Sequence, residues 1–267
     1  MSEDGSRVLK LEGVHNFRDY GGYRATGGQL RRGVLWRSGQ HAEASDADLA
    51  SIDSLGLRAV IDLRTHAERA RMPSRRAEGC AARVIVSQDA MAMPASGGEA
   101  MGLGAAGARP RTAEGNRDRL RHAYGEFPFR PPLVAVTRRY LAELAECDGP
   151  SVIHCLAGKD RTGYSVAMVL AALGVHRDDV MEDYLLTNTA GDSEARIEAG
   201  RRSIQAIWGD MEDAALRALM AVEPEYLAIT YAVIDEQYGS LEAYLETVLG
   251  ADGALREKLV ERLVEKV

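Results

Sequence analysis

Short apolar segments alternate with longer amphipathic ones along the first two thirds of the chain, which predicts strands followed by helices. The short segments are rich in Val, Ile and Leu, as in strands that are buried on both faces. Strands separated by helices favour an α/β fold in which a central, mostly parallel sheet is flanked by helices. The strands are predicted near residues 34–36, 57–62, 84–87 and 151–155, with a further short strand at residues 8–11.

Apolar residues at helical spacing, with capping residues before them and turn glycines after them, indicate the helices. Phe127, Pro128 and Phe129 form a predicted hinge between two of these helices. From residue 178 onward the pattern is helical almost throughout. Helices are predicted at residues 45–55, 65–71, 117–124, 132–146, 164–173 and 178–187, and then at about 193–208, 211–221, 224–238, 241–249 and 253–265.

Residues 90–115 interrupt this order with a segment that is rich in Met, Ala and Gly. Such a composition predicts a long, mobile loop without a core of its own. The loop is either a flap over a functional site or a passive insertion, and the passive insertion is the favoured interpretation.

Length and charge narrow the function classes. A chain of 267 residues with 46% hydrophobic content suits one large α/β domain, alone or with a helical appendage. Its net charge of −7 makes it a poor candidate for nucleic-acid binding. An anionic substrate remains compatible with this charge, because a local cluster of donors can outweigh a distant negative surface.

The cysteines and the first residues indicate the compartment. Cys80, Cys147 and Cys155 form no CxxC motif and no Cys/His cluster, so no structural zinc site is expected, and their low number suits a reducing cytosol. The polar, acidic start lacks the pattern of a signal peptide, and no run is long enough for a transmembrane helix. The expected location is therefore the cytoplasm, or the outside of the cell by export without a classical signal.

Residues 154–163, with the sequence HCLAGKDRTG, carry the clearest chemistry. They lie between a predicted buried strand and a predicted buried helix, so the segment is a loop that ends in a helix N-terminus. Such a terminus binds anions through its free N–H groups and its partial positive charge, and it stabilises a thiolate.

The spacing within this loop suits a tetrahedral anion. Arg161 follows Cys155 by six residues, and its planar fork can hold two oxygens at once. Thr162 can donate its hydroxyl to the cysteine sulfur when the sulfur is a leaving group. The backbone N–H groups that would surround the anion belong to Leu156, Ala157, Gly158, Lys159, Asp160 and Arg161.

The run His154-Cys155, five residues, Arg161-Thr162-Gly163 resembles the signature loop of the cysteine-dependent protein tyrosine and dual-specificity phosphatases. The segments NFRDYGG at residues 16–22 and RRGVLWRSG at 31–39 resemble a bacterial branch of atypical members of this family. That branch includes a secreted mycobacterial enzyme and bacterial lipid phosphatases. Residues 224–245 resemble the same branch. The resemblance thus spans the chain and implies one domain over residues 1–267, with a helical lid or extension at about 190–267.

The resemblance implies a hydrolase that forms a cysteinyl-phosphate intermediate on Cys155, with Arg161 as the oxyanion clamp. His154 and the loop residues from Leu156 to Lys159, together with Thr162, would belong to the binding site. The implied substrates are phosphotyrosine, with phosphoserine, phosphothreonine and phosphoinositides as further candidates. No metal and no cofactor are implied, and the oligomeric state stays open.

The identity of the general acid has two candidates. In the bacterial branch this acid is an Asp inside the loop, just before the arginine, and Asp160 occupies that place. Asp89 follows a predicted strand, as the acid of the wider family does, and it ranks second. Lys159 resembles a loop residue of lipid-active members, which suggests phosphoinositide headgroups as substrates.

Several polar residues outside the loop have both a functional and a structural interpretation. Asn16, Arg18 and Asp19 either line the pocket or pin a turn. Asp62 and Arg64 lie at a strand end, and a structural ion pair is the favoured interpretation. The predicted helix at 193–208 carries three arginines that either meet a polyanionic substrate or form a solvated face, with the solvated face favoured: Arg196, Arg201 and Arg202.

Two other function classes are compatible with an anion loop. One is a phosphate-recognition module with little turnover. The other is a sulfur-transfer or arsenate-reducing enzyme, for which Cys80 or Cys147 would have to act as a partner thiol.

Overall fold

The computed structural model describes residues 7–86 and 112–266, and Asp89 together with most of the 90–115 segment lies outside these residues. The described chain forms an α/β fold, as predicted, around a sheet with the strand order β1-β4-β7-β5-β6. Strands β4, β7, β5 and β6 run parallel, and β1 pairs antiparallel with β4 at one edge. In chain order the strands are β1 (Arg18–Asp19), β4 (Leu35–Ser38), β5 (Ala59–Asp62), β6 (Arg83–Val86) and β7 (Ser151–His154).

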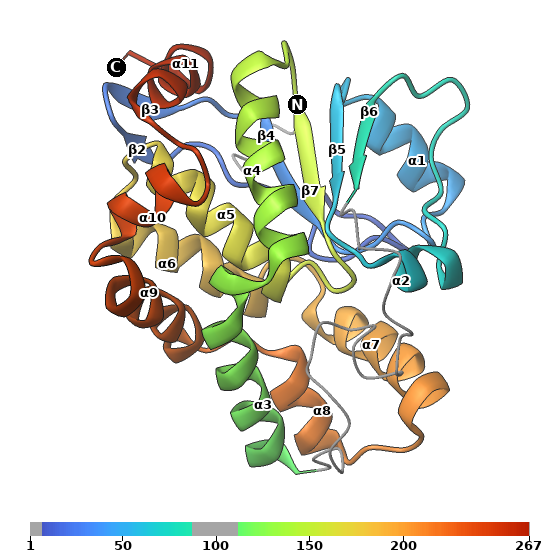
Figure 1. The fold of residues 1–267 in the computed structure, drawn as a ribbon. Coiled ribbons are helices and arrows are strands. Elements are labelled where there is room, and N and C mark those ends of the chain that lie inside the picture. The colour runs from blue at the N-terminus through green and yellow to red at the C-terminus, as the bar shows by residue number, and fades with distance from the viewer. Residues whose placement is uncertain (1–6, 87–111, 267) are drawn as a thin grey trace.

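Helices lie on both faces of this sheet (Figure 1). Their first turns follow the expected capping chemistry, for example at α1 and α2, where Ser45 and Thr65 each close a capping box with the third helical residue. The helices of the first part are α1 (Asp46–Asp53), α2 (His66–Arg71), α3 (Ala113–Glu126), α4 (Pro131–Glu146), α5 (Asp160–Ala172) and α6 (Arg177–Leu185). Those of the last part are α7 (Ser193–Trp208), α8 (Asp213–Met220), α9 (Pro224–Tyr238), α10 (Leu241–Thr247) and α11 (Gly253–Leu263).

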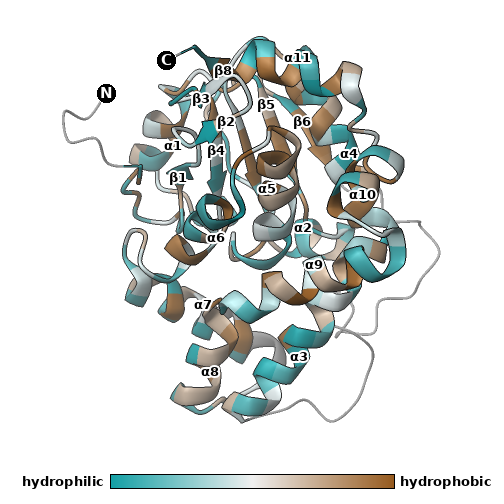
Figure 2. Ribbon diagram, turned by 90° about the vertical axis from the view of Figure 1, so that its left-hand side faces the viewer, coloured by the Kyte–Doolittle hydropathy of each residue, from teal (hydrophilic) through white to brown (hydrophobic). Residues whose placement is uncertain are grey.

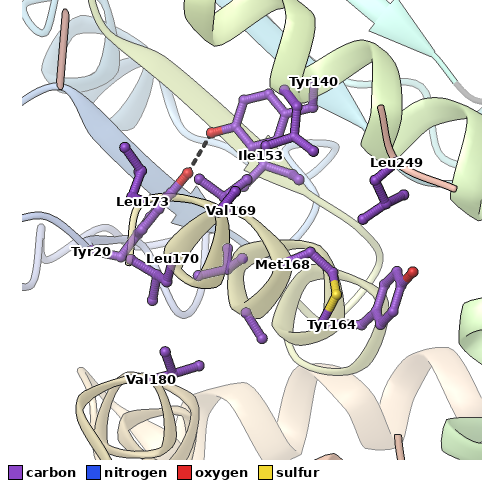
Figure 3. Packing of buried hydrophobic residues seen from close by; sticks show 14 of the residues in the cluster. Tyr20, Tyr140, Ile153, Tyr164, Met168, Val169, Leu170, Leu173, Val180 and Leu249 are labelled. Carbon is purple, nitrogen blue, oxygen red and sulfur yellow. Dashed lines mark hydrogen bonds between the residues drawn. The ribbon is translucent and has the colours of Figure 1, made fainter. Parts of the chain in front are cut away.

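The sheet separates two hydrophobic clusters because successive strand residues point to opposite faces. On one face Ile61 and Ile153 pack with residues of α4 and α5, and on the other Val60 and Val152 pack with Ile52 of α1. Helix α5 is buried along almost its whole length and appears mostly hydrophobic in Figure 2. Figure 3 shows how the side chains of α5 pack against those of α4 and β7. Beside them, the hydroxyls of Tyr20 and Tyr140 form a hydrogen bond of 2.5 Å.

Two local predictions are wrong. Residues 8–11 do not form a strand: within this segment only Val8 forms a bridge, with Arg18. The chain turns away directly afterwards because the N–H groups of Glu12 and Gly13 are bound by the carboxylate of Asp48 at 2.8 and 2.7 Å.

The second error concerns the end of the last helix. The predicted helix at 253–265 ends at Leu263, and strand β8 (Val264–Glu265) follows it. This strand pairs with β3 (Gly28–Leu30), which also pairs with β2 (Arg24–Ala25), in a small antiparallel sheet. A pairing between residues more than 200 positions apart leaves no local signal in a two-residue strand. The predicted hinge at Phe127–Phe129 is a 3-10 helix, and α3 is longer than predicted because Thr112 caps it.

The strand register places three loops at one edge of the sheet. Ser38, the last residue of β4, is opposite His154, the last residue of β7, which is also opposite Asp62 at the end of β5. The segments that follow these strands therefore converge, and α3, α7 and α8 lie below this edge in Figure 1. No helix within the described residues is long and apolar enough to span a membrane.

Candidate active site

The loop at residues 154–163 joins β7 to α5, as predicted, and Cys155 is its first residue after the strand. The cysteine is buried, with 3% of its surface exposed. Gly158 has a φ of 68°, and a Cβ there would come within 2.4 Å of the backbone of Ser38. The loop therefore requires glycine at this position, because the conformation favours glycine and the neighbouring strand end leaves no room.

The N–H groups of this loop are free to bind an anion. Within the part of the chain that the structure describes, the amides from Leu156 to Arg161 donate no hydrogen bond to a protein acceptor, and the first helical bond is Gly163 N–H to the Lys159 carbonyl at 2.7 Å. The first amides of any α-helix lack partners, and here the preceding loop adds further ones. The arrangement is that of an oxyanion-binding nest at a helix N-terminus.

One edge of the Arg161 guanidinium is held by Glu68 of α2. Nη1 and Nη2 donate to the two oxygens of the Glu68 carboxylate at 2.7 and 2.8 Å, and Nη1 also donates to the Leu63 carbonyl at 3.3 Å. A guanidinium has five N–H groups, so the Nε–H and one N–H of Nη2 remain for an anion. Burial lowers the pKa of Arg161, but Glu68 outweighs this effect and raises the pKa, so Arg161 stays positively charged. The predicted fork is thus present and is aimed by a buried carboxylate.

A buried ion network supports the loop beneath Gly158. The Gly158 carbonyl accepts from Asn16 Nδ2 at 2.8 Å and from Arg37 Nη2 at 3.1 Å. Asp183 pairs with Arg37 at 2.5 Å and with Arg18 at 3.3 Å, and all three side chains are at most 1% exposed. Burial and the nearby Arg37 lower the pKa of Arg18 to about 10, against the effect of Asp183.

This network decides between the two interpretations of the N-terminal segment. Asn16 has a φ of 59° and contacts the loop directly, and Arg18 also donates to Asn16 Oδ1. Asp19 accepts from the N–H groups of Gly21 and Gly33, both at 2.8 Å, so it pins a turn. The segment therefore braces the loop and the adjoining turn.

A second polar group lies beside His154. The ring of His154 stacks on that of His41, with the ring centres 4.8 Å apart, and His41 Nε2 forms a hydrogen bond with the Ser38 hydroxyl at 2.9 Å. Burial lowers the pKa of both histidines, so both rings are neutral near pH 7. Asp62 lies 3.8 Å from His154 but pairs closely with Arg64, at 2.7 Å.

The Asp62–Arg64 pair has the structural role that the sequence favoured. Arg64 also donates to the Met72 carbonyl at 2.7 Å and to the Ser74 hydroxyl at 2.6 Å, which ties the segment after α2 to the strand end. Burial raises the pKa of Asp62, but the charge and hydrogen bonds of Arg64 help to hold the pKa below the usual value.

Asp160, the first residue of α5, accepts two hydrogen bonds on the same oxygen. Lys159 Nζ donates to its Oδ1 at 2.7 Å, and the Tyr124 hydroxyl donates to the same atom at 3.0 Å. The hydroxyl of Tyr184 donates in turn to that of Tyr124 at 2.8 Å. Burial raises the pKa of Tyr124 and Tyr184 well above the ordinary value, so both hydroxyls stay protonated. The Oδ2 atom is left without a partner among the described residues.

Helices α7 and α8 cover the cysteine. Ile204 of α7, together with Leu219 and Met220 of α8, lines a cavity of about 50 Å³ above Cys155 and Arg161. Lys159 Nζ donates to the Ala221 carbonyl at 3.2 Å, and Arg196 Nη1 donates to the Met220 carbonyl at 2.7 Å. Two cations thus meet the carbonyl end of α8, where the helix dipole favours them.

Several of the predicted loop residues line one small cavity: Cys155, Leu156, Ala157, Lys159, Asp160 and Arg161. His154, Gly158 and Thr162 are not among them. Asp89, the second candidate acid, lies outside the described residues. Glu68, Tyr124 and Asp183 were missed. Glu68 had a local signal, since Thr65-x-x-Glu68 is a capping box, but its second role depends on the approach of α2 to α5. No group of three His, Cys, Asp or Glu residues in the described ranges could hold a metal ion.

A cysteine that opens an amide-lined loop, followed after five residues by an arginine at a helix N-terminus, defines the class of cysteine-dependent phosphatases. The tyrosine phosphatase family model matches residues 9–265. The chain belongs to the tyrosine phosphatase family.

Three relatives agree with this assignment. A provisionally named tyrosine-protein phosphatase of Cupriavidus necator is 31% identical over 257 residues, which cover 95% of this chain and 88% of that protein. The triple specificity protein phosphatase PtpB of Mycobacterium tuberculosis is 31% identical over 290 residues, covering 96% of this chain and 97% of PtpB. A tyrosine-protein phosphatase of Nostoc commune is 27% identical over 220 residues, which cover 79% of this chain and 68% of that protein. The resemblance to the bacterial branch is thereby confirmed.

Proposed function

We propose that this tyrosine phosphatase family member hydrolyses phosphotyrosine through a phosphoryl group carried on Cys155. The observation that supports the proposal most strongly is the set of unpaired amides from Leu156 to Arg161, in the loop that directly follows Cys155. The free edge of Arg161 adds a bidentate donor to the same place. Preorganised donors of this kind supply the largest share of transition-state stabilisation in many enzymes.

In the first step the Cys155 thiolate attacks phosphorus in line and forms an S–P bond while the bond from phosphorus to the tyrosyl oxygen breaks. Asp160, protonated at Oδ2, gives its proton to the departing oxygen. In the second step water attacks phosphorus, Asp160 accepts the water proton, and the S–P bond breaks to release inorganic phosphate. The Thr162 hydroxyl is buried and has no hydrogen-bond partner among the described residues, so it is available to donate to the departing thiolate.

The proposal predicts a leaving-group dependence in Asp160→Asn. Loss of the acid should lower kcat on phenyl phosphate, a poor leaving group, by about 10²- to 10⁴-fold, and should spare 4-nitrophenyl phosphate, whose phenolate departs without a proton. Steady-state kinetics on both esters measures this. Asp89→Asn is the matched variant, and it should behave like the wild type on both. If the two variants exchange these behaviours, Asp89 is the acid.

Tyr124 is predicted to position this acid, because its hydroxyl and Lys159 both hold Oδ1 and so direct Oδ2 toward the leaving group. In Tyr124→Phe, kcat on phenyl phosphate should fall by up to about tenfold, as expected for one lost hydrogen bond. The basic limb of its pH–rate profile, which reports the loss of the Asp160 proton, should also shift. Tyr164→Phe is a matched control, because this buried tyrosine pairs with Tyr244 and not with Asp160. An unchanged leaving-group dependence in Tyr124→Phe would refute the positioning role.

Substrate breadth is a further part of the proposal. The relative PtpB is named a triple specificity phosphatase, and Lys159 stands in the loop here. In the described state Lys159 is 3% exposed and is bound to Asp160 and to α8, so it would reach a substrate only when α7 and α8 move away. We infer that phosphoinositides are accepted beside phosphotyrosine. Phosphate release from a phosphotyrosine peptide and from a panel of phosphoinositides tests this, and release from the peptide alone would limit the enzyme to protein substrates.

A further inference from the structure

The three arginines of α7 have different environments. Arg201 pairs with Glu198 at 3.0 Å and with Asp213 at 2.5 Å, and Arg202 approaches Glu43 at 3.5 Å with 59% of its side chain exposed. These two belong to a charged surface, as the sequence favoured. Arg196 is only 4% exposed.

Arg196 lacks the partner that a buried guanidinium normally has. Its Nη1 donates to the Met220 carbonyl, its Nε has no acceptor, and no carboxylate lies within 4.0 Å in residues 7–86 and 112–266. Burial lowers its pKa, and only the more distant Asp160 opposes this. Buried cations are paired in nearly all proteins, because an unpaired one loses its hydration without compensation. An anion from outside the chain would complete this site.

The space for such an anion lies beside the cavity above Cys155. Arg196 lines a second cavity of about 70 Å³, together with His15, Gln40 and Glu43. Both cavities are also lined by the same four residues, Leu156, Ala157, Ile204 and Met220. The two sites therefore share one wall, which is formed by the signature loop and the covering helices.

We propose that Arg196 binds a second phosphate of the substrate, carried on the same small ring as the phosphate that Cys155 attacks. This inference rests on the proposed function, and it assigns to that function a substrate class with neighbouring phosphates. Glu43 lines the same cavity, but its carboxylate is oriented toward Arg202 at the surface. His15, whose pKa is lowered by burial, adds no charge and can donate a hydrogen bond.

The burial of Arg196 favours a ring over a peptide as the carrier of this phosphate. Phosphates on adjacent carbons of a polyol ring lie side by side, so both can enter beneath α7 and α8. In a peptide, the neighbouring acidic group branches from the backbone, which lies at the far end of the phosphotyrosine side chain and thus outside these cavities. The two small, adjoining cavities fit the first arrangement.

The test compares kcat/KM for short-chain phosphatidylinositol 3-phosphate and 3,4-bisphosphate. The wild type should favour the bisphosphate by about tenfold or more, the value of a charge-assisted hydrogen bond. In Arg196→Gln the ratio of the two kcat/KM values should fall to about one. Arg196→Lys keeps the charge without the planar fork, so its ratio should lie between those of Arg196→Gln and the wild type. Arg202→Gln removes a surface arginine of the same helix and should keep the wild-type ratio.

Three results would overturn the inference. One is an equal ratio in wild type and in both Arg196 variants, each folded by circular dichroism. Another is turnover of a phosphotyrosine peptide without turnover of either lipid. The third is an Arg196-dependent preference for a peptide that carries phosphothreonine next to phosphotyrosine, with no such preference between the lipids. If the wild type cleaves none of these phosphate esters, the proposed function itself fails, so the two failures are distinguishable.

Discussion

Cys155→Ser is expected to lower kcat for any phosphate ester by at least about 10⁴-fold, the scale of loss when an enzyme nucleophile is removed. A serine hydroxyl in the same place keeps its proton near neutral pH, so it cannot attack phosphorus as the thiolate does. The amides of the loop and the free edge of Arg161 are unchanged in this variant. The protein should therefore still bind phosphotyrosine peptide, which calorimetry can measure beside turnover.

Cys147→Ser is the matched control for this substitution. Cys147 caps the C-terminus of α4 just before the first residue of β7, at the opposite end of that strand from Cys155, and burial raises the pKa of its thiol, so it is a poor nucleophile. Its replacement should leave kcat unchanged. Undiminished hydrolysis by Cys155→Ser would exclude the covalent mechanism.

Asp183→Asn should have the largest effect on folding, with a loss of about 3–5 kcal/mol in the free energy of unfolding. The neutral amide leaves Arg18 and Arg37 buried next to each other without a counter-charge. Because Arg37 also holds the Gly158 carbonyl, the loop should lose its geometry as well. Denaturant unfolding gives the stability, and the affinity for inorganic phosphate reports on the loop.

The pH dependence of stability gives a second measure of Asp183. Burial raises its pKa, but Arg18 and Arg37 outweigh burial and hold the pKa below the usual value. A depressed pKa stabilises the fold above the unfolded value of about 4, and this stabilisation is lost as the pH falls below it. The variant should therefore show a weaker acid dependence than the wild type. Asp178 is an exposed residue of the same helix. Asp178→Asn should therefore change the free energy of unfolding by no more than about 0.5 kcal/mol, at neutral or at acid pH. A similarly small effect in Asp183→Asn would show that its ion pairs with Arg18 and Arg37 do not stabilise the fold.

The sequence predicted the sheet and most helices because both depend on local signals. The strands near 57–62 and 151–155 contain short, buried apolar cores, Ala59-Val60-Ile61 and Val152-Ile153, and α1 and α2 begin with capping boxes. The short strands β2, β3 and β8 depend on contacts between distant segments, and two or three residues carry too little pattern to reveal them.

The loop chemistry was also predictable, because Cys155 and Arg161 are close in sequence and their spacing has a physical reason. The residues that aim these groups were not. Glu68 and Tyr124 contact the loop from α2 and α3, and Asp183 of α6 acts through Arg37. Apart from the capping box of Glu68, these residues look like ordinary helical residues in the sequence. The same holds for Arg196, which the sequence grouped with Arg201 and Arg202 and which the fold alone separates from them.

Trapping the phosphoryl group on the enzyme tests the covalent mechanism most directly. The protein is mixed with a phosphotyrosine peptide, quenched in acid within milliseconds, and digested for mass spectrometry. We expect one added phosphoryl group on the peptide that contains Cys155, and none in Cys155→Ser. Two results would exclude a phosphoryl group on Cys155. One is turnover without this adduct in both wild type and Asp160→Asn, and the other is a phosphoryl group on another residue.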